Sequence, residues 1–213
     1  VAGDRHQLPP TNFFQTIEAD EYDDDDEYDD TCISFESILN ACDSVDLPQK
    51  MLNWHYRSKD ESLITYSNYH FYGNRLYTFP TADSHDELTG LKYTYIHDGV
   101  YKKGSGSRHN LKEAKKVVEL VREHLIRNPE LSLGIVTFSL TQRKAIEEEL
   151  DLMRKEQPVL NPLFSIDRDE PIFIKNLENV QGDERDVIIL SVGYGKDETG
   201  KMTMNFGPLN KEG

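Results

Sequence analysis

The 213-residue sequence has few cysteines and no long hydrophobic run. The two cysteines, Cys32 and Cys42, are too few and wrongly spaced for a zinc site, and two free thiols are typical of a reducing compartment. No apolar stretch approaches the ~18–20 residues that cross a bilayer, and the first residues lack the basic-then-apolar order of a signal peptide. These absences predict a cytoplasmic protein with no membrane partner.

Positive charge is also in short supply, which argues at first against nucleic-acid binding. The formal net charge is −15, from 39 acidic residues against 24 lysines and arginines. Ten of the acidic residues fall within 18–30, however, and without them the chain carries 29 acidic and 24 basic residues. The remaining net charge of −5 therefore leaves room for a local basic groove.

Composition divides the chain into three parts. Residues 1–17 form a short lead segment that contains Pro9-Pro10. Residues 18–31 form an acidic run whose like charges repel and which has no apolar face to bury, so it is expected to be a solvated loop or a disordered insert. Residues 32–213 have the composition of a packed domain and contain no internal repeat.

Strand and helix signals alternate within this domain. The segments typical of strands are 91–96, 133–138, 172–174 and 187–192. Apolar residues at helical intervals follow Asn110, where Glu113 completes the spacing of a capping box, and a second helical pattern follows Ser139. Continuous apolar strands separated by amphipathic helices predict an α/β fold, in which helices cover both faces of a parallel sheet and ligands bind at the carboxyl ends of the strands.

The segment Gln181-Gly182-Asp183-Glu184 carries the first functional signal. Gly182 has no Cβ, so its backbone N–H can approach a phosphate oxygen, and the Glu184 carboxylate can accept hydrogen bonds from a ribose. Taken alone, the segment also fits a polar turn between two strands, because Gly-Asp favours turns.

Two other segments carry weaker signals. Tyr56 offers a ring that can stack on a base, and Arg57 offers a guanidinium that can reach a terminal phosphate, although both residue types also occur on ordinary surfaces. Gln7 lies in a compact turn, and its amide can sense a phosphate.

The order of these segments strengthens the interpretation. Gly-Asp-x-x-Gln-Leu-Pro-Pro, Leu-x-x-x-Tyr-Arg-Ser and Val-Gln-Gly-Asp-Glu-x-Asp-Val-Ile-Ile-Leu-Ser closely resemble motifs III, IV and V of superfamily 1 helicases. The likeness is greatest to the branch that contains the nonsense-mediated-decay RNA helicase and large bacterial helicase-related proteins. It covers roughly residues 1–15 and 40–213, and the acidic run is not part of the pattern.

The resemblance implies a role for each matching residue. Gln7 and Arg57 would act in catalysis, Arg57 at the γ-phosphate and Gln7 as a link between phosphate and nucleic acid. Tyr56, Gly182 and Glu184 would bind the nucleotide. In the segment between motifs IV and V, Thr137 and Gln142 would contact nucleic acid. The implied fold is the second RecA-like domain of a helicase, with residues 1–17 as the end of the first.

Several parts of such a helicase have no counterpart in the sequence. It contains no Gly-x-x-x-x-Gly-Lys-Ser/Thr loop for phosphates, no Asp-Glu pair before Gly3 for Mg²⁺, and no arginine-rich motif VI. The chain is thus expected to run from motif III to just before motif VI and to contain no metal site of its own. The resemblance implies a parent that uses ATP with Mg²⁺, moves along single-stranded DNA or RNA, and holds the nucleotide mainly through its first RecA-like domain. The isolated chain is expected to be inactive.

Two other functions remain to be weighed. A degenerate RecA-like module could use the acidic run to bind a basic partner or to mimic nucleic acid, without any enzymatic activity. A metabolic α/β enzyme would need a catalytic constellation, and the seven histidines are scattered with no nucleophile in a suitable turn.

Overall fold

The computed structural model describes residues 3, 4, 6, 38–80, 89–102 and 108–202. The acidic run 18–31 and the expected catalytic residue Gln7 lie outside the described residues. The chain divides into two compact units, one of residues up to Lys92 and one from Tyr93 onward, and each is considered by itself. The expectation of a single domain over residues 32–213 stays a prediction.

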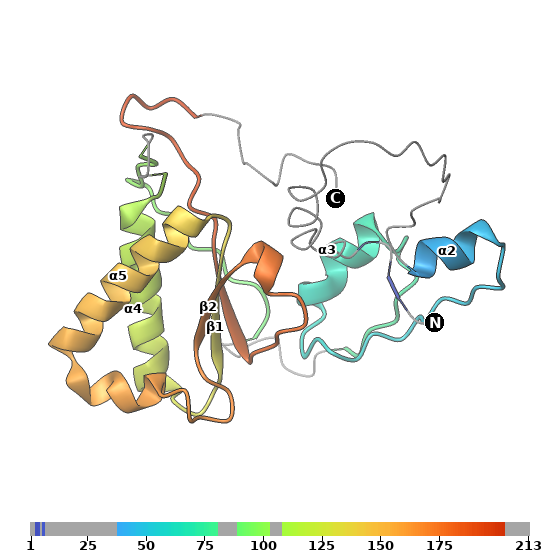
Figure 1. Cartoon of the computed structure of the whole chain (residues 1–213), viewed down its shortest axis with the longest axis horizontal. Coiled ribbons are helices and arrows are strands. Elements are labelled where there is room, and N and C mark those ends of the chain that lie inside the picture. Colours follow the sequence, from blue (N-terminus) through green and yellow to red (C-terminus); the bar gives the residue numbers. More distant parts are fainter. Residues whose placement is uncertain (1–2, 5, 7–37, 81–88, 103–107, 203–213) are drawn as a thin grey trace, which may run out of the picture. The chain divides into compact units, whose positions relative to one another are not determined.

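The first unit contains two short helices, α2 (Ile38–Ser44) and α3 (Ser62–His70) (Figure 1). After α3 the chain reverses in a tight turn, in which Arg75 N donates to Tyr72 O at 3.1 Å. Both central residues of this turn, Gly73 and Asn74, have positive φ angles of 59° and 58°. Glycine and asparagine are the residues that tolerate this conformation best, so the sequence Gly-Asn directs the reversal.

A three-stranded parallel sheet forms the centre of the second unit. Its strands are β1 (Leu133–Thr137), β2 (Phe173–Asn176) and β3 (Val187–Ser191), in the order β2-β1-β3. β1 pairs in parallel with both neighbours and is buried along its whole length, as expected for a central strand. The predicted α/β fold with a parallel sheet is confirmed, although the described long helices cover only one of the two faces that were expected to be covered.

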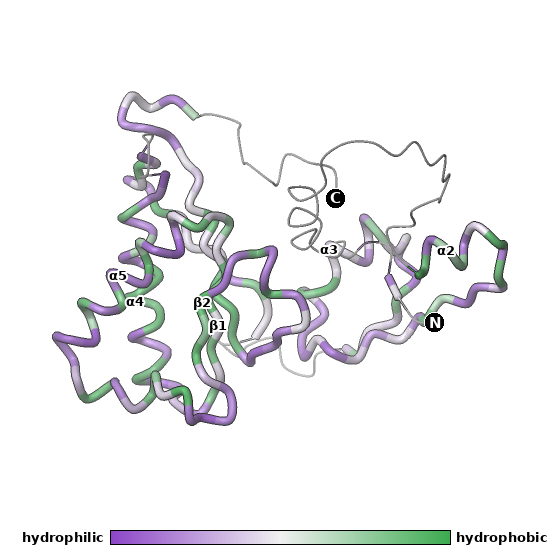
Figure 2. Tube along the Cα trace, viewed as in Figure 1, coloured by the Kyte–Doolittle hydropathy of each residue, from purple (hydrophilic) through white to green (hydrophobic). Residues whose placement is uncertain are grey.

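Two long helices, α4 (Leu111–Arg127) and α5 (Leu140–Glu156), pack side by side against this sheet (Figure 1). Figure 2 shows the alternation of hydrophobic and hydrophilic residues along both helices. Each begins at its predicted cap: Asn110 Oδ1 accepts from Glu113 N at 3.2 Å, and Ser139 Oγ accepts from Gln142 N at 3.2 Å. No described helix is long and apolar enough to span a bilayer.

The two faces of the sheet differ. Ile135 pairs with Ile174 and with Ile189, and this row joins the hydrophobic core beneath α4 and α5. The alternate row contains Ile188 and Leu190 of β3, which are 39% and 57% exposed. The connection from β2 to β3 contains the short 3-10 helix η3 (Leu177–Asn179). Lys175, which belongs to the alternate row, forms an ion pair with Asp183 of this connection, so the connection lies on the second face.

The strand expected over residues 91–96 does not form. The segment has no regular structure, and its ring at Tyr93 is 87% exposed. Tyr93 and Tyr95 lie with their rings 6.4 Å apart and nearly parallel, as two side chains of an extended segment can. The side chains of this segment do alternate in type, but no described strand forms hydrogen bonds with it. A strand needs a neighbouring strand, which an alternating sequence alone does not provide.

Candidate functional site

The turn at Gly182 is the most distinctive backbone feature of the second unit. Asp183 N donates to Val180 O at 3.0 Å, and Gly182 has a φ of 88°. Such a φ at the third position of a turn is the reason for a glycine here. A Cβ added at Gly182 would meet no atom within 4 Å, so the backbone of this turn faces open space. A phosphate group can therefore approach the peptide closely, as a phosphate-binding turn requires.

Glu184 follows this turn and is exposed. Its backbone is fixed by Arg185, whose guanidinium donates to Glu184 O at 2.6 Å and to Pro171 O at 2.9 Å. The geometry thus presents a carboxylate two residues from the open Gly182 peptide, on a backbone that is tied to the start of β2. The spacing suits a ribose beside a phosphate.

Tyr56 and Arg57 lie in the first unit and are both exposed, with Tyr56 at 79%. The residues on either side of them are joined: His55 Nε2 lies 2.7 Å from Ser58 Oγ and accepts from Ser58 N at 3.3 Å. This closes a tight loop from which the two side chains project. No pattern in the sequence indicated this local role of His55.

Thr137 and Gln142 are both completely buried, which differs from the expectation that their side chains contact nucleic acid. Gln142 Oε1 accepts from Asn110 N at 2.8 Å, and its Nε2 donates to Ser191 Oγ at 3.1 Å. Thr137 Oγ1 lies 3.2 Å from Asn176 Oδ1. These contacts hold together the carboxyl ends of the strands and the first turns of α4 and α5, so the side chains have an internal role.

Asp4, from the lead segment, contacts the end of α3 within the first unit. Its carboxylate accepts hydrogen bonds from the Tyr72 hydroxyl and, at 3.0 Å, from His6 N. Burial, together with the hydrogen bond and charge of Asp4, raises the pKa of Tyr72 to about 12. Asp4 and His6 therefore belong to the unit that carries Arg57, whereas Gln7 lies outside the described residues.

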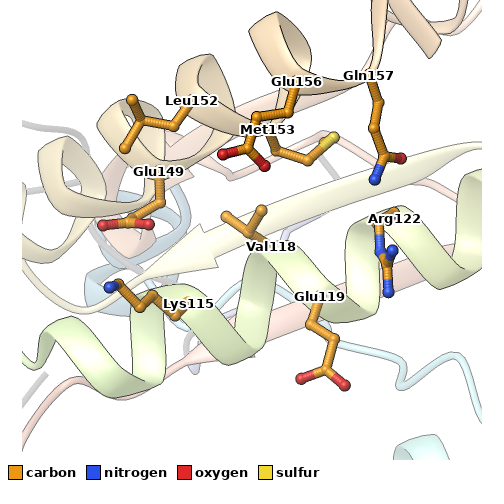
Figure 3. A pocket seen from close by; sticks show the side chains of 9 residues that line it. All are labelled: Lys115, Val118, Glu119, Arg122, Glu149, Leu152, Met153, Glu156 and Gln157. Atoms are coloured by element: carbon orange, nitrogen blue, oxygen red, sulfur yellow. The ribbon is translucent and has the colours of Figure 1, made fainter. Parts of the chain in front are cut away.

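A shallow groove of about 410 Å³ separates α4 from α5 on their outer side (Figure 3). Its lining mixes both signs of charge with a small apolar floor: Lys115, Val118, Glu119, Arg122, Glu149, Leu152, Met153, Glu156 and Gln157. None of the predicted site residues lines it. This groove is therefore not part of the candidate site.

Comparison with known proteins gives a consistent result. A family model described as an AAA domain matches residues 33–206. The whole chain is 34% identical over 222 residues to MG140 of Mycoplasma genitalium, described as an ATP-dependent helicase, and 34% identical over 227 residues to its homologue in Mycoplasma pneumoniae. The chain spans 19% of the length of each relative.

Proposed function

Because this chain belongs to the AAA-domain family, in its superfamily 1 helicase type, we propose that it is the second RecA-like domain of an ATP-driven translocase on single-stranded DNA or RNA. The parallel α/β sheet is the RecA-like fold of P-loop NTPases. The observation that carries the proposal is the open turn at Gly182, an exposed glycine shortly before β3 whose missing Cβ leaves room for a phosphate to approach the backbone.

Each candidate residue has a part in this proposal. The Gly182 N–H donates to a phosphate oxygen, and the Glu184 carboxylate accepts from the ribose hydroxyls. Tyr56 stacks near the base, and Arg57 stabilises the charge that develops on the γ-phosphate when the two RecA-like domains close. Gln7 links the nucleotide phosphate to the bound single strand. The remaining phosphate contacts and the Mg²⁺ ligands come from the first RecA-like domain of the parent polypeptide.

The contact with nucleic acid is indirect for Thr137 and Gln142, since both are buried. They fix the first turn of α5, where Thr141 is partly exposed and its hydroxyl donates to Arg108 O. Arg108 is exposed beside it. A strand bound at the carboxyl ends of the sheet would meet these surface residues, and the buried pair would set their position.

Gly182→Ala in the full-length protein tests the proposal, with Gly200→Ala as a matched control. Gly200 also has a positive φ, 78°, and also has no atom within 4 Å of an added Cβ, so both substitutions strain an open turn alike. Gly182→Ala should raise the KM for ATP in strand-stimulated hydrolysis roughly 10- to 100-fold, because the added methyl group would keep the phosphate from the backbone N–H and so weaken one charge-assisted hydrogen bond.

Gly200→Ala should leave that KM unchanged. An equal effect of both substitutions would mean that strain alone is measured and that Gly182 does not meet the phosphate. Absence of any strand-stimulated hydrolysis in the unmodified protein would instead favour the non-enzymatic interaction module.

A further inference from the structure

Lys175 lies on β2 in the row that faces away from α4 and α5, opposite Val136 of β1. Its Nζ is 2.6 Å from Asp183 Oδ2, and the two side chains are 36% and 25% exposed. This ion pair joins the end of β2 to the residue that directly follows Gly182. It is the least exposed of the ion pairs found among the described residues.

The Phe173 ring fixes the position of the lysine. Lys175 Nζ lies 5.3 Å from the centroid of this ring, and the guanidinium of Arg185 lies 4.9 Å from it. The ring itself lies against Gly134, where an added Cβ would come 2.5 Å from Phe173 Cζ. We call Phe173, Lys175 and Arg185 the cation clamp. It holds the two residues that follow Gly182, because Lys175 pairs with the Asp183 carboxylate and Arg185 donates to Glu184 O.

The charge of Asp183 gives the clamp a second effect. The carboxylate follows the peptide that would donate to a phosphate, and two anions at close range repel each other. Lys175 neutralises that carboxylate while it also holds the turn. Removal of the ammonium would therefore leave a carboxylate beside the phosphate position without its cation.

We propose that Lys175 is a positioning residue for nucleotide binding, which holds the Gly182 turn and cancels the charge of Asp183. This inference rests on the proposed function, since it takes the Gly182 turn as the phosphate contact. It predicts an asymmetry between the two partners of the ion pair. Lys175→Met keeps the apolar stem over the ring but unmasks the carboxylate, whereas Asp183→Asn removes the anion itself.

The KM for ATP of the full-length protein should therefore rise about tenfold in Lys175→Met, which corresponds to ~1.4 kcal/mol, and only about two- to threefold in Asp183→Asn. The double variant should resemble Asp183→Asn, and Lys175→Arg should retain most of the affinity. The defect of Lys175→Met should shrink as salt rises, because salt screens the repulsion. Equal defects in both single variants would overturn the electrostatic role.

Hydrogen exchange, measured by mass spectrometry on the same protein without nucleotide, tests the holding role separately. Exchange in the peptide that covers residues 180–186 should accelerate in Lys175→Met and in Asp183→Asn. Lys112→Met is the control, because its ion pair with Asp98 (2.5 Å) is exposed and lies away from the turn. Unchanged exchange in both clamp variants would overturn the inference.

The two proposals fail in different ways. If Gly182→Ala raises the KM and Lys175→Met does not, the phosphate turn stands and the role of Lys175 is refuted. If Gly182→Ala has no effect while Lys175→Met accelerates exchange, the clamp holds a turn that does not bind nucleotide, which refutes both the proposed function and the inference built on it.

Discussion

Ser132 and Asp186, 54 positions apart in the sequence, exchange three hydrogen bonds at the amino ends of β1 and β3. Ser132 N and Oγ donate to Asp186 Oδ2 at 3.1 and 3.0 Å, and Asp186 N donates to Ser132 Oγ at 3.0 Å. The pair sets the register of the two strands immediately after the candidate phosphate turn. A shift by one residue would exchange the core and solvent faces of β3.

Ser132→Ala should lower the free energy of unfolding by about 1–3 kcal/mol, because it removes the hydroxyl of the buried Ser132, which both accepts from Asp186 N and donates to the Asp186 carboxylate. The measurement is chemical denaturation of the chain. Ser165→Ala is the control, since Ser165 makes a similar exchange with Asp167 on the exposed surface and over only two positions. A loss of the same size in both variants would mean that the strand pairing does not depend on Ser132.

The hydrogen bond from Tyr72 to Asp4 should make stability depend on pH in the alkaline range. The pKa of the Tyr72 hydroxyl is raised from 10.0 to about 12, so the folded state favours the protonated phenol. The stabilisation is therefore complete below pH 10 and disappears as pH rises from 10 to about 12. The difference in unfolding free energy between the unchanged protein and Tyr72→Phe should follow this course.

Tyr93→Phe controls for the loss of a hydroxyl, because the Tyr93 ring is 87% exposed. A Tyr72→Phe difference that stays constant through pH 12 would show that the Tyr72 hydroxyl is not bound to a carboxylate.

Arg57→Ala in the full-length protein should abolish strand-stimulated ATP hydrolysis and leave ATP affinity largely intact. A guanidinium at the γ-phosphate acts mainly on the transition state and is worth about 10³–10⁵ in rate. Arg57→Lys should rescue poorly, because an ammonium lacks the planar two-pronged donor geometry. Turnover and nucleotide affinity, measured together, separate catalysis from binding.

Arg75→Ala provides the matched control in the same unit, where Arg75 is exposed and its Nε donates to Tyr72 O. Wild-type turnover in Arg57→Ala would identify Arg57 as an ordinary surface residue.

Local signals predicted much of the second unit. Asn110 and Ser139 each start a helix as expected, because a cap depends on residues only two or three positions away. Glu113, however, does not complete the capping box, since its carboxylate accepts from Ser191 Oγ and Gly193 N instead. Those partners are distant in sequence, so no local pattern could reveal them.

The same limit explains the differences at the site. Gln142 was expected to contact nucleic acid because its segment resembles one that does so in helicases, but its burial depends on Asn110 and Ser191, 32 and 49 positions away. The Gly182 turn was predictable because glycine itself sets the conformation. The ion pair that holds the turn was not, since lysine and aspartate are also common on open surfaces.

β3 is fixed at both ends, by Ser132 and Asp186 at its start and by Glu113 at Ser191 and Gly193 beyond its end. These contacts at both ends resist a sliding movement of β3 along its own axis. A displacement of the Gly182 turn would therefore reach β2 through Lys175, which pairs with Asp183, and Pro171 before β2 through Arg185. Displacement of the turn would thus be felt first at the outer strand next to Asn176, where Thr137 is also anchored.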